Sequence, residues 1–143
     1  MRDKDPLKDI LLKSMELSKV GRQEEAFALL DESLSEAVRE NRLMWIPILC
    51  RHAAVISDSI GNLQRTKHYY EQSLGFDPHD VGSLYGLANA LQRQGETQLA
   101  KQYASKCFQS IQHSEKELDR AVLELILKSW PEFRRSDGRV EHP

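Results

Sequence analysis

Two stretches of this sequence, 34 residues apart, share one pattern and decide the fold. Residues 84–95 read Leu84-Tyr-Gly-Leu-Ala-Asn-Ala-Leu-Gln-Arg-Gln-Gly95, and residues 50–61 read Cys50-Arg-His-Ala-Ala-Val-Ile-Ser-Asp-Ser-Ile-Gly61. Each places apolar or small residues at i, i+3, i+4 and i+7 and then ends in glycine, which is typical of an amphipathic helix and its C-terminus. A fixed period of this length indicates a repeat protein.

The same pattern extends in both directions from these stretches. Towards the N-terminus the match needs a shift of 40, which places Gly21 on Gly61 and Leu34 on Leu74. The first unit is therefore six residues longer, and the excess falls near residues 41–46. A further shift of 34 towards the C-terminus places Leu118, Ala121, Val122 and Leu125 on Leu84, Leu87, Ala88 and Leu91. We expect three helical hairpins, over residues 7–46, 47–80 and 81–114, and a capping helix over residues 115–130.

The turn signals divide these units into seven helices. Glycines at positions 21, 61 and 95 can adopt the left-handed conformation that ends a helix. Pro78 stops the second hairpin, Asp5 and Asp80 are candidate N-caps, and Ser114 with Glu117 has the spacing of a capping box. The expected helices cover residues 7–20, 23–43, 47–60, 63–75, 81–94, 97–112 and 115–130.

These units resemble the tetratricopeptide repeat (TPR) family over about residues 7–130. The third unit matches the signature best, at Leu84, Leu87-Ala88, Leu91, Gly95, Leu99-Ala100 and Cys107. No unit has the family's tryptophan, and the first has Lys13-Ser14 where Leu-Gly is usual. The resemblance implies an all-α fold, a right-handed α-solenoid of three hairpins plus the capping helix. Residues 1–130 would form a single domain, and residues 131–143 a flexible tail.

Composition and motifs argue against several other classes of protein. The 20 Lys and Arg residues are balanced by 22 Asp and Glu, so attraction of the whole surface to nucleic acid or to an anionic membrane is not expected. Cys50 and Cys107 are 57 residues apart and form no CxxC pair, and the histidines have no zinc-site spacing. No nucleotide-binding or nucleophile-elbow motif occurs. We therefore expect a cytoplasmic protein without enzymatic activity, metal or cofactor.

In the repeat family, the first helix of each hairpin lines a concave groove. The resemblance makes eight residues candidates for peptide binding: Arg51, His52, Val55, Tyr85, Asn89, Arg93, Lys116 and Arg120. The whole predicted groove face also includes the cations Lys8 and Lys19 and apolar residues such as Leu12, Met15 and Ile48, with one acid, Asp119. This local excess of positive charge predicts a protein or peptide partner with an anionic segment, acidic or C-terminal. The alternative is an ordinary solvated basic face.

Some members of the family bind the C-terminal carboxylates of heat-shock chaperones with lysine, arginine and asparagine side chains. Arg51, Lys116 and Arg120 match the three basic positions of that clamp. Val55 and Gly86 occupy its two asparagine positions and offer no side-chain amide, which argues against a chaperone clamp.

The expected capping helix is apolar around more than half of its circumference. Leu123, Leu127 and Trp130 lie off the stripe that should face the third hairpin. Three alternatives follow: these side chains are covered by Phe133 and the tail, form a homodimer contact, or meet a ligand in the groove. A homodimerising scaffold is therefore the alternative to a peptide-binding module.

Overall fold

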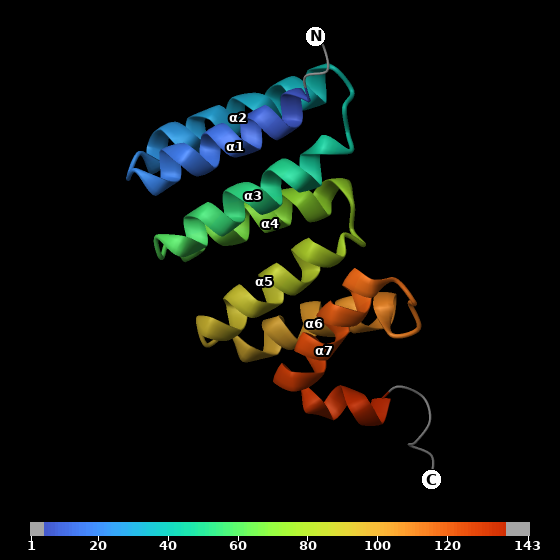
Figure 1. Ribbon diagram of the computed structural model, residues 1–143. Helices are drawn as coiled ribbons and strands as arrows, with labels where there is room; N and C mark the ends of the chain where they lie inside the picture. The colour runs from blue at the N-terminus through green and yellow to red at the C-terminus, as the bar shows by residue number, and fades with distance from the viewer. Residues whose placement is uncertain (1–4, 137–143) are drawn as a thin grey trace. The chain divides into compact units, whose positions relative to one another are not determined.

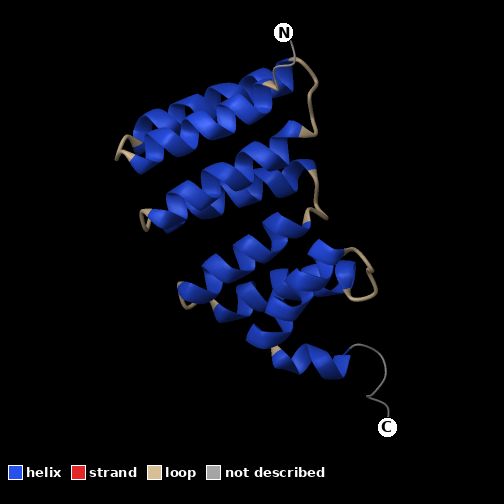
Figure 2. Cartoon of the chain, in the orientation of Figure 1, coloured by secondary structure: helices blue, strands red, loops and turns tan. Residues whose placement is uncertain are grey.

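The computed structural model describes residues 5–136, and their regular structure is entirely helical (Figures 1 and 2). In chain order the helices of this part are α1 (Pro6–Lys19), α2 (Gln23–Arg39), α3 (Trp45–Ser59), α4 (Leu63–Phe76), α5 (Val81–Arg93), α6 (Thr97–Ile111), α7 (Glu117–Ser129) and the 3-10 helix η1 (Pro131–Ser136). The predicted all-α class is confirmed. Six of the seven predicted α-helices begin and end within two residues of the observed positions.

The helices fall into two compact units, of which the first ends at Pro78 and the second begins at His79. The single domain that the sequence predicted over residues 1–130 stays a prediction, and the two units are described separately below. Asp77 has an extended backbone (φ −139°, ψ 90°), because the residue before a proline disfavours helical geometry. The helix therefore ends at Phe76, at the boundary between the units.

Unit 1 consists of two antiparallel hairpins, α1–α2 and α3–α4, and α3 contacts both helices of the first hairpin. In Figure 1, α1 and α3 run in the same direction. Ala26, Ala53 and Ala54 are fully buried, and such small side chains allow helix axes to approach closely. Phe27 and Leu49 supply much of the volume of the core between the helices.

The three predicted turn glycines all have positive φ, between 75° and 85°. After each of them the chain closes back on the helix: the backbone N–H of Asn62 donates to the carbonyl of Ser57 at 2.9 Å, and that of Glu96 donates to Leu91 at 3.0 Å. These bonds satisfy carbonyls that the end of the helix leaves without an intrahelical donor.

Helix α2 ends at Arg39, four residues before the predicted end. Asn41 has φ 59°, and the N–H of Arg42 donates to the carbonyl of Ala37 at 2.8 Å. Asparagine tolerates this left-handed conformation, so it ends α2 in the way that glycine ends α1 and α3. The extra residues of the first repeat therefore lie in the connection to α3 and not in a longer helix.

Two of the predicted helix starts are confirmed and one is wrong. The Asp5 carboxylate accepts from the N–H of Lys8 at 3.3 Å, and Asp80 accepts from that of Ser83 at 3.0 Å. The capping box at Ser114 does not form, because α7 begins at Glu117. The Ser114 hydroxyl instead donates to Asp119 at 2.7 Å and accepts from the Lys116 N–H at 3.1 Å.

Unit 2 consists of the α5–α6 hairpin, with α7 packed on both helices and η1 packed on α7. The expectation of a flexible tail from residue 131 is wrong for residues 131–136, which form η1. Phe133 is buried there, with its ring centroid 5.3 Å from that of Phe108 and 6.4 Å from that of Trp130. Burial of this aromatic ring stabilises the folded conformation of the segment. Residues 137–143 of the predicted tail lie outside the described part of the chain.

The turn at Gly61 can be tested against a second glycine in the same unit. Gly61→Ala should lower the free energy of unfolding by about 1 kcal/mol, because alanine is strained at φ 75°. Gly75→Ala is the matched control: Gly75 lies within α4, and a Cβ at either position meets open space. This change should raise the stability by about 0.5 kcal/mol. Urea unfolding followed by circular dichroism measures both, and equal effects would contradict the role of the turn.

Candidate functional site

The eight predicted groove residues belong to two different units. Arg51, His52 and Val55 lie on α3 in unit 1. In unit 2, Tyr85, Asn89 and Arg93 lie on α5, while Lys116 is the N-cap of α7 and Arg120 lies in its first turns. The structure therefore places these residues in two sets, and one groove containing both sets stays a prediction.

The set in unit 1 lies on a surface that we call the α1–α3 face, made of Leu12, Met15, Arg51, His52 and Val55. Leu12 is 48% exposed, Met15 42% and Val55 59%. The His52 ring hydrogen-bonds the backbone of Leu11, which places this part of α3 against α1. Leu12 and Met15 belong to α1 and Val55 belongs to α3, so the apolar side chains of this face come from two helices that contact each other. The face therefore combines three exposed apolar side chains with Arg51 and His52, which are half-buried.

The surroundings of His52 on this face shift the pKa of its imidazole. Burial lowers the pKa of His52, and its hydrogen bond to the Leu11 backbone opposes this effect only in part. Its Nε2 atom is buried and has no hydrogen-bond partner among the described residues. A neutral imidazole suits this place, because a proton on Nε2 would bring a charge into a site that offers no acceptor.

The set on α5 shares one helix face, since Tyr85, Asn89 and Arg93 are spaced by four residues. Burial raises the pKa of Tyr85, so its hydroxyl is a neutral donor at physiological pH. Tyr85 and Asn89 are half-buried and Arg93 is exposed. This face can hydrogen-bond a peptide backbone through a phenol and an amide next to a cation.

Lys116 and Arg120 are both exposed at the start of α7. They are one helical turn apart, since the backbone N–H of Arg120 donates to the carbonyl of Lys116 at 3.0 Å. Asp119, the one acid of the predicted groove face, accepts the hydroxyl proton of Ser114. The Asp119 carboxylate therefore binds a residue of the connection between α6 and α7.

The three candidate dimer contacts on the last helix are less accessible than the sequence suggested. Trp130 is 4% exposed and stacks on Phe133, while Leu123 and Leu127 are half-buried. Phe133 covers Trp130 within the chain, and a dimer contact through Leu123, Leu127 and Trp130 stays a prediction. The chain turns back after Trp130, and η1 places Phe133 on the indole.

The stripe that was expected to face the third hairpin points elsewhere. Leu118 is 81% exposed and Leu125 45%, whereas Ile126 is fully buried. Ile126 and Trp130 are four residues apart and therefore share the inward side of α7. The buried aromatic cluster at the end of the helix sets which side of α7 faces inward.

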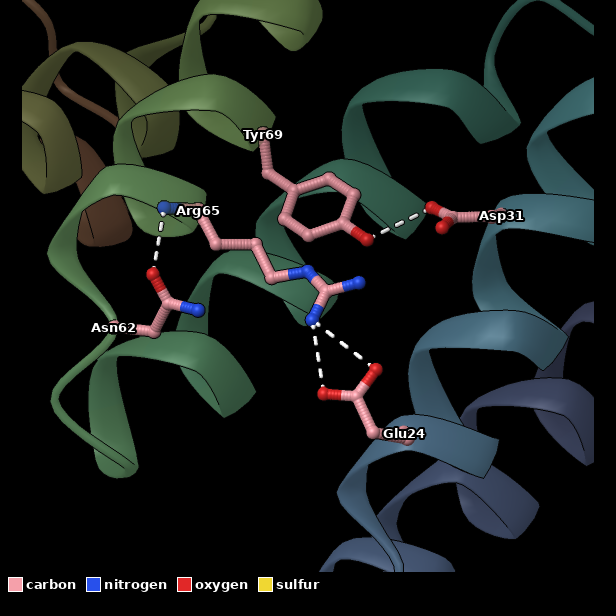
Figure 3. Close-up of polar contacts among 5 residues, drawn as sticks. All are labelled: Glu24, Asp31, Asn62, Arg65 and Tyr69. Atoms are coloured by element: carbon pink, nitrogen blue, oxygen red, sulfur yellow. Dashed lines mark hydrogen bonds and ion pairs between the residues drawn. The ribbon is translucent and has the colours of Figure 1, made fainter.

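Sequence reasoning missed a polar cluster that joins the two hairpins of unit 1 (Figure 3). The Tyr69 hydroxyl on α4 donates to the Asp31 carboxylate on α2 at 2.8 Å. Arg65 of α4 forms an ion pair with Glu24 of α2 at 3.2 Å and lies over the Phe27 ring, 3.9 Å from its centroid. Tyr69 and Asp31 are 38 residues apart in the chain, and Arg65 and Glu24 are 41 residues apart, so no local sequence pattern predicts these contacts.

This cluster is better explained by packing than by chemistry. Burial and the bond to Asp31 raise the pKa of Tyr69, which keeps the phenol protonated as a donor. A cavity of about 380 Å³ opens beside it, lined in part by Asp31, His68 and Tyr69. Because the cluster's charged side chains pair with one another across α2 and α4, we interpret it as the contact that holds hairpin on hairpin.

The cysteines are core residues, as expected. Cys50 and Cys107 are fully buried, and burial raises the pKa of Cys107 to about 12. Within residues 5–136 no group of three or more histidine, cysteine or acidic side chains is close enough to hold a metal ion. None of the helices in this part of the chain combines the length and apolar character needed to cross a membrane.

A larger cleft, of about 860 Å³, lies in unit 2 along α6 and η1. Its walls are mostly glutamine, serine and lysine side chains, with Trp130 and Phe133 among the lining residues. An ion pair between Lys101 and Glu132 at 3.1 Å links α6 to η1. Both aromatic side chains are buried to 5% exposure or less, so they contribute little of the cleft's accessible surface.

The inter-hairpin hydrogen bond in unit 1 has a measurable energy. Tyr69→Phe should lower the free energy of unfolding by about 1 kcal/mol, because it leaves the Asp31 carboxylate without its phenol donor. A double-mutant cycle with Asp31→Ala should give a coupling energy of similar size. Tyr103→Phe is the control, since Tyr103 is the repeat equivalent of Tyr69 and contacts Lys106 through its ring. A coupling energy near zero would remove the cluster as a structural contact.

Stability in weak acid should depend on His52. Its pKa is lowered in the folded state from the ordinary value of 6.5, so the unfolded chain binds more protons and stability falls as the pH drops below about 6.5. His52→Gln removes this contribution and should flatten the fall between pH 7 and pH 5. His113→Gln, a change at an exposed histidine, should leave the curve unchanged. Urea unfolding at several pH values would refute the assignment if both variants behaved alike.

A comparison of the sequence with protein-family models gave no match, and neither did a comparison with curated proteins. The family resemblance therefore depends on the residue pattern alone.

Proposed function

We propose that this protein is a repeat module of the tetratricopeptide type that binds a peptide segment of another protein and has no catalytic role. The observation that carries the proposal is the α1–α3 face. Three large apolar side chains, Leu12, Met15 and Val55, are 42–59% exposed there on two neighbouring helices. Apolar side chains exposed together on adjacent elements are typical of surfaces that bind another protein.

The charge around this face supports an anionic partner. On the predicted groove face of unit 1, Lys8, Lys19 and Arg51 are the charged residues, and all are basic. A peptide with aspartate, glutamate or a free C-terminal carboxylate would be attracted and oriented by these cations. Its apolar side chains would contact Leu12, Met15 and Val55 and set the register.

The residues of unit 2 supply a second set of contacts in this proposal. Tyr85 and Asn89 present a phenol and an amide, which can donate to and accept from peptide groups. Arg93, Lys116 and Arg120 add positive charge. We treat the two sets as separable contacts, so each can be tested by substitutions within its own unit.

The homodimerising scaffold, which the sequence left as the alternative, has less support. It depended on Leu123, Leu127 and Trp130, and Trp130 is buried under Phe133.

Charge reversal tests the proposal. Arg51→Glu combined with Arg120→Glu should weaken binding of a fluorescent ten-residue peptide of Asp, Glu and Leu with a free C-terminus at least tenfold, because two attractive contacts become repulsive. Fluorescence anisotropy at low and high salt measures the affinity, and each single variant shows how much its own unit contributes.

The charge-matched control is Lys13→Glu with Lys106→Glu. These exposed lysines lie outside the predicted groove face, one in each unit, and the control changes the net charge equally. It should retain wild-type affinity, and all variants should retain wild-type helicity. Unchanged binding in the Arg51→Glu, Arg120→Glu variant would overturn the proposed function. If the variant loses binding as expected, a pull-down from the source organism's extract with the wild-type chain and this variant would identify the natural partner.

A further inference from the structure

Helix α7 carries an exposed apolar stripe, made of Leu118, Ala121, Val122 and Leu125, which we call the α7 stripe. Leu118 is 81% exposed and Leu125 45%, Ala121 is exposed, and Val122 is half-buried. The stripe lies beside the side of α7 that buries Ile126. An amphipathic helix that packs on its neighbours with one side and leaves leucines exposed on another has a second surface to cover.

The chain itself contains the same stripe in covered form. A shift of 34 residues places the α7 stripe on Leu84, Leu87, Ala88 and Leu91 of α5. Those four residues are at most 2% exposed, and α6 packs along α5. The buried side chains of α6 are small or apolar, namely Ala100, Ala104, Cys107, Phe108 and Ile111. The stripe on α5 therefore has a helix packed along its own helix. Within residues 5–136 the corresponding stripe on α7 stays exposed.

The charges beside the stripe indicate what kind of helix would cover it. Glu117 precedes Leu118 and Glu124 precedes Leu125, seven residues or two helical turns apart. Both carboxylates therefore lie on the same side of the two leucines. Helix α6, which covers the equivalent stripe, contains Lys101 and Lys106 and no acidic residue. A covering helix with lysine or arginine along one edge would complement Glu117 and Glu124.

A second copy of α7 would complement the charges of this surface only in part. If two α7 helices packed antiparallel through the stripe with Ala121 opposite Leu125, the two Glu124 carboxylates would approach each other across the interface. In the same arrangement Lys128 of one copy would lie beside Glu117 of the other. The centre of such a dimer therefore brings like charges together, whereas a helix with a basic edge would oppose both Glu117 and Glu124 with positive charge.

We infer that the α7 stripe is a docking site for an amphipathic helix of another protein, one with a small and apolar face and a basic edge. The docked helix takes the position on α7 that α6 takes on α5. This site is separate from the α1–α3 face, so a failed peptide-groove experiment leaves it untouched.

The probe is a synthetic, end-capped peptide with the sequence of Thr97–Ile111, used under reducing conditions with the full chain labelled with nitrogen-15. The wild-type protein should bind it, with the largest amide shifts in residues 117–125. Leu118→Glu with Leu125→Glu should weaken binding at least tenfold while helicity is retained, because both leucines are exposed. Glu117→Gln with Glu124→Gln should also weaken it and remove its dependence on salt, because the two negative charges that attract the basic peptide are lost.

Leu99→Glu is the matched control, since Leu99 is an exposed leucine of unit 2 outside α7. It should leave the affinity unchanged. Three results would overturn the inference. One is the absence of binding to the wild-type chain. Another is equal binding by the Leu118→Glu, Leu125→Glu variant, as expected if the peptide displaced α6 from α5. The third is a wild-type dimer in light scattering that this variant converts to monomer, which would assign the stripe to a second copy.

Discussion

The structure depends on one backbone constraint, a residue with positive φ directly after the end of a helix. Gly61 follows α3 and Asn41 follows α2, and in both cases the next N–H turns back to a carbonyl of the last helical turn. The reversal lets the next helix run antiparallel, so that two apolar stripes too narrow to form a core alone are buried against each other. The hairpins α1–α2, α3–α4 and α5–α6 each contain such a turn, at Gly21, Gly61 and Gly95.

Once the hairpins form, their packing decides which helix faces remain for binding. In unit 1, α3 uses one side against α4 and another against the first hairpin, and Val55 and Arg51 lie outside the tightest packing. The Arg65–Glu24 and Tyr69–Asp31 contacts hold α4 against α2. The Leu12, Met15 and Val55 side chains can thus stay exposed without weakening these two contacts, which involve other residues.

In unit 2 the same sequence stripe is packed in two different ways. The α5–α6 hairpin buries its stripe completely, while α7 repeats the stripe and turns a different side inward. Its C-terminal part is anchored by Ile126 and by the stacked rings of Trp130 and Phe133. The aromatic contacts outweigh the repeat register in choosing the buried side. As a consequence, leucines that a further helix would cover become surface residues.

The sequence by itself determined the helical class, six of the seven pairs of helix boundaries to within two residues, and the three glycine turns, because each of these depends on side chains within a few positions of one another. Asp5, Asp80 and the three glycines are signals of this kind. It also predicted that Leu12, Met15 and Val55 face outward. One side of a helix stays exposed to solvent when its other sides are packed against neighbouring helices.

Only the tertiary structure decided which side of α7 packs inward, that Trp130 is covered by Phe133, and that Tyr69 meets Asp31 across 38 residues. The same holds for the division of the helices at Pro78. These features result from competition between alternative contacts, and periodicity does not rank such contacts by their energy.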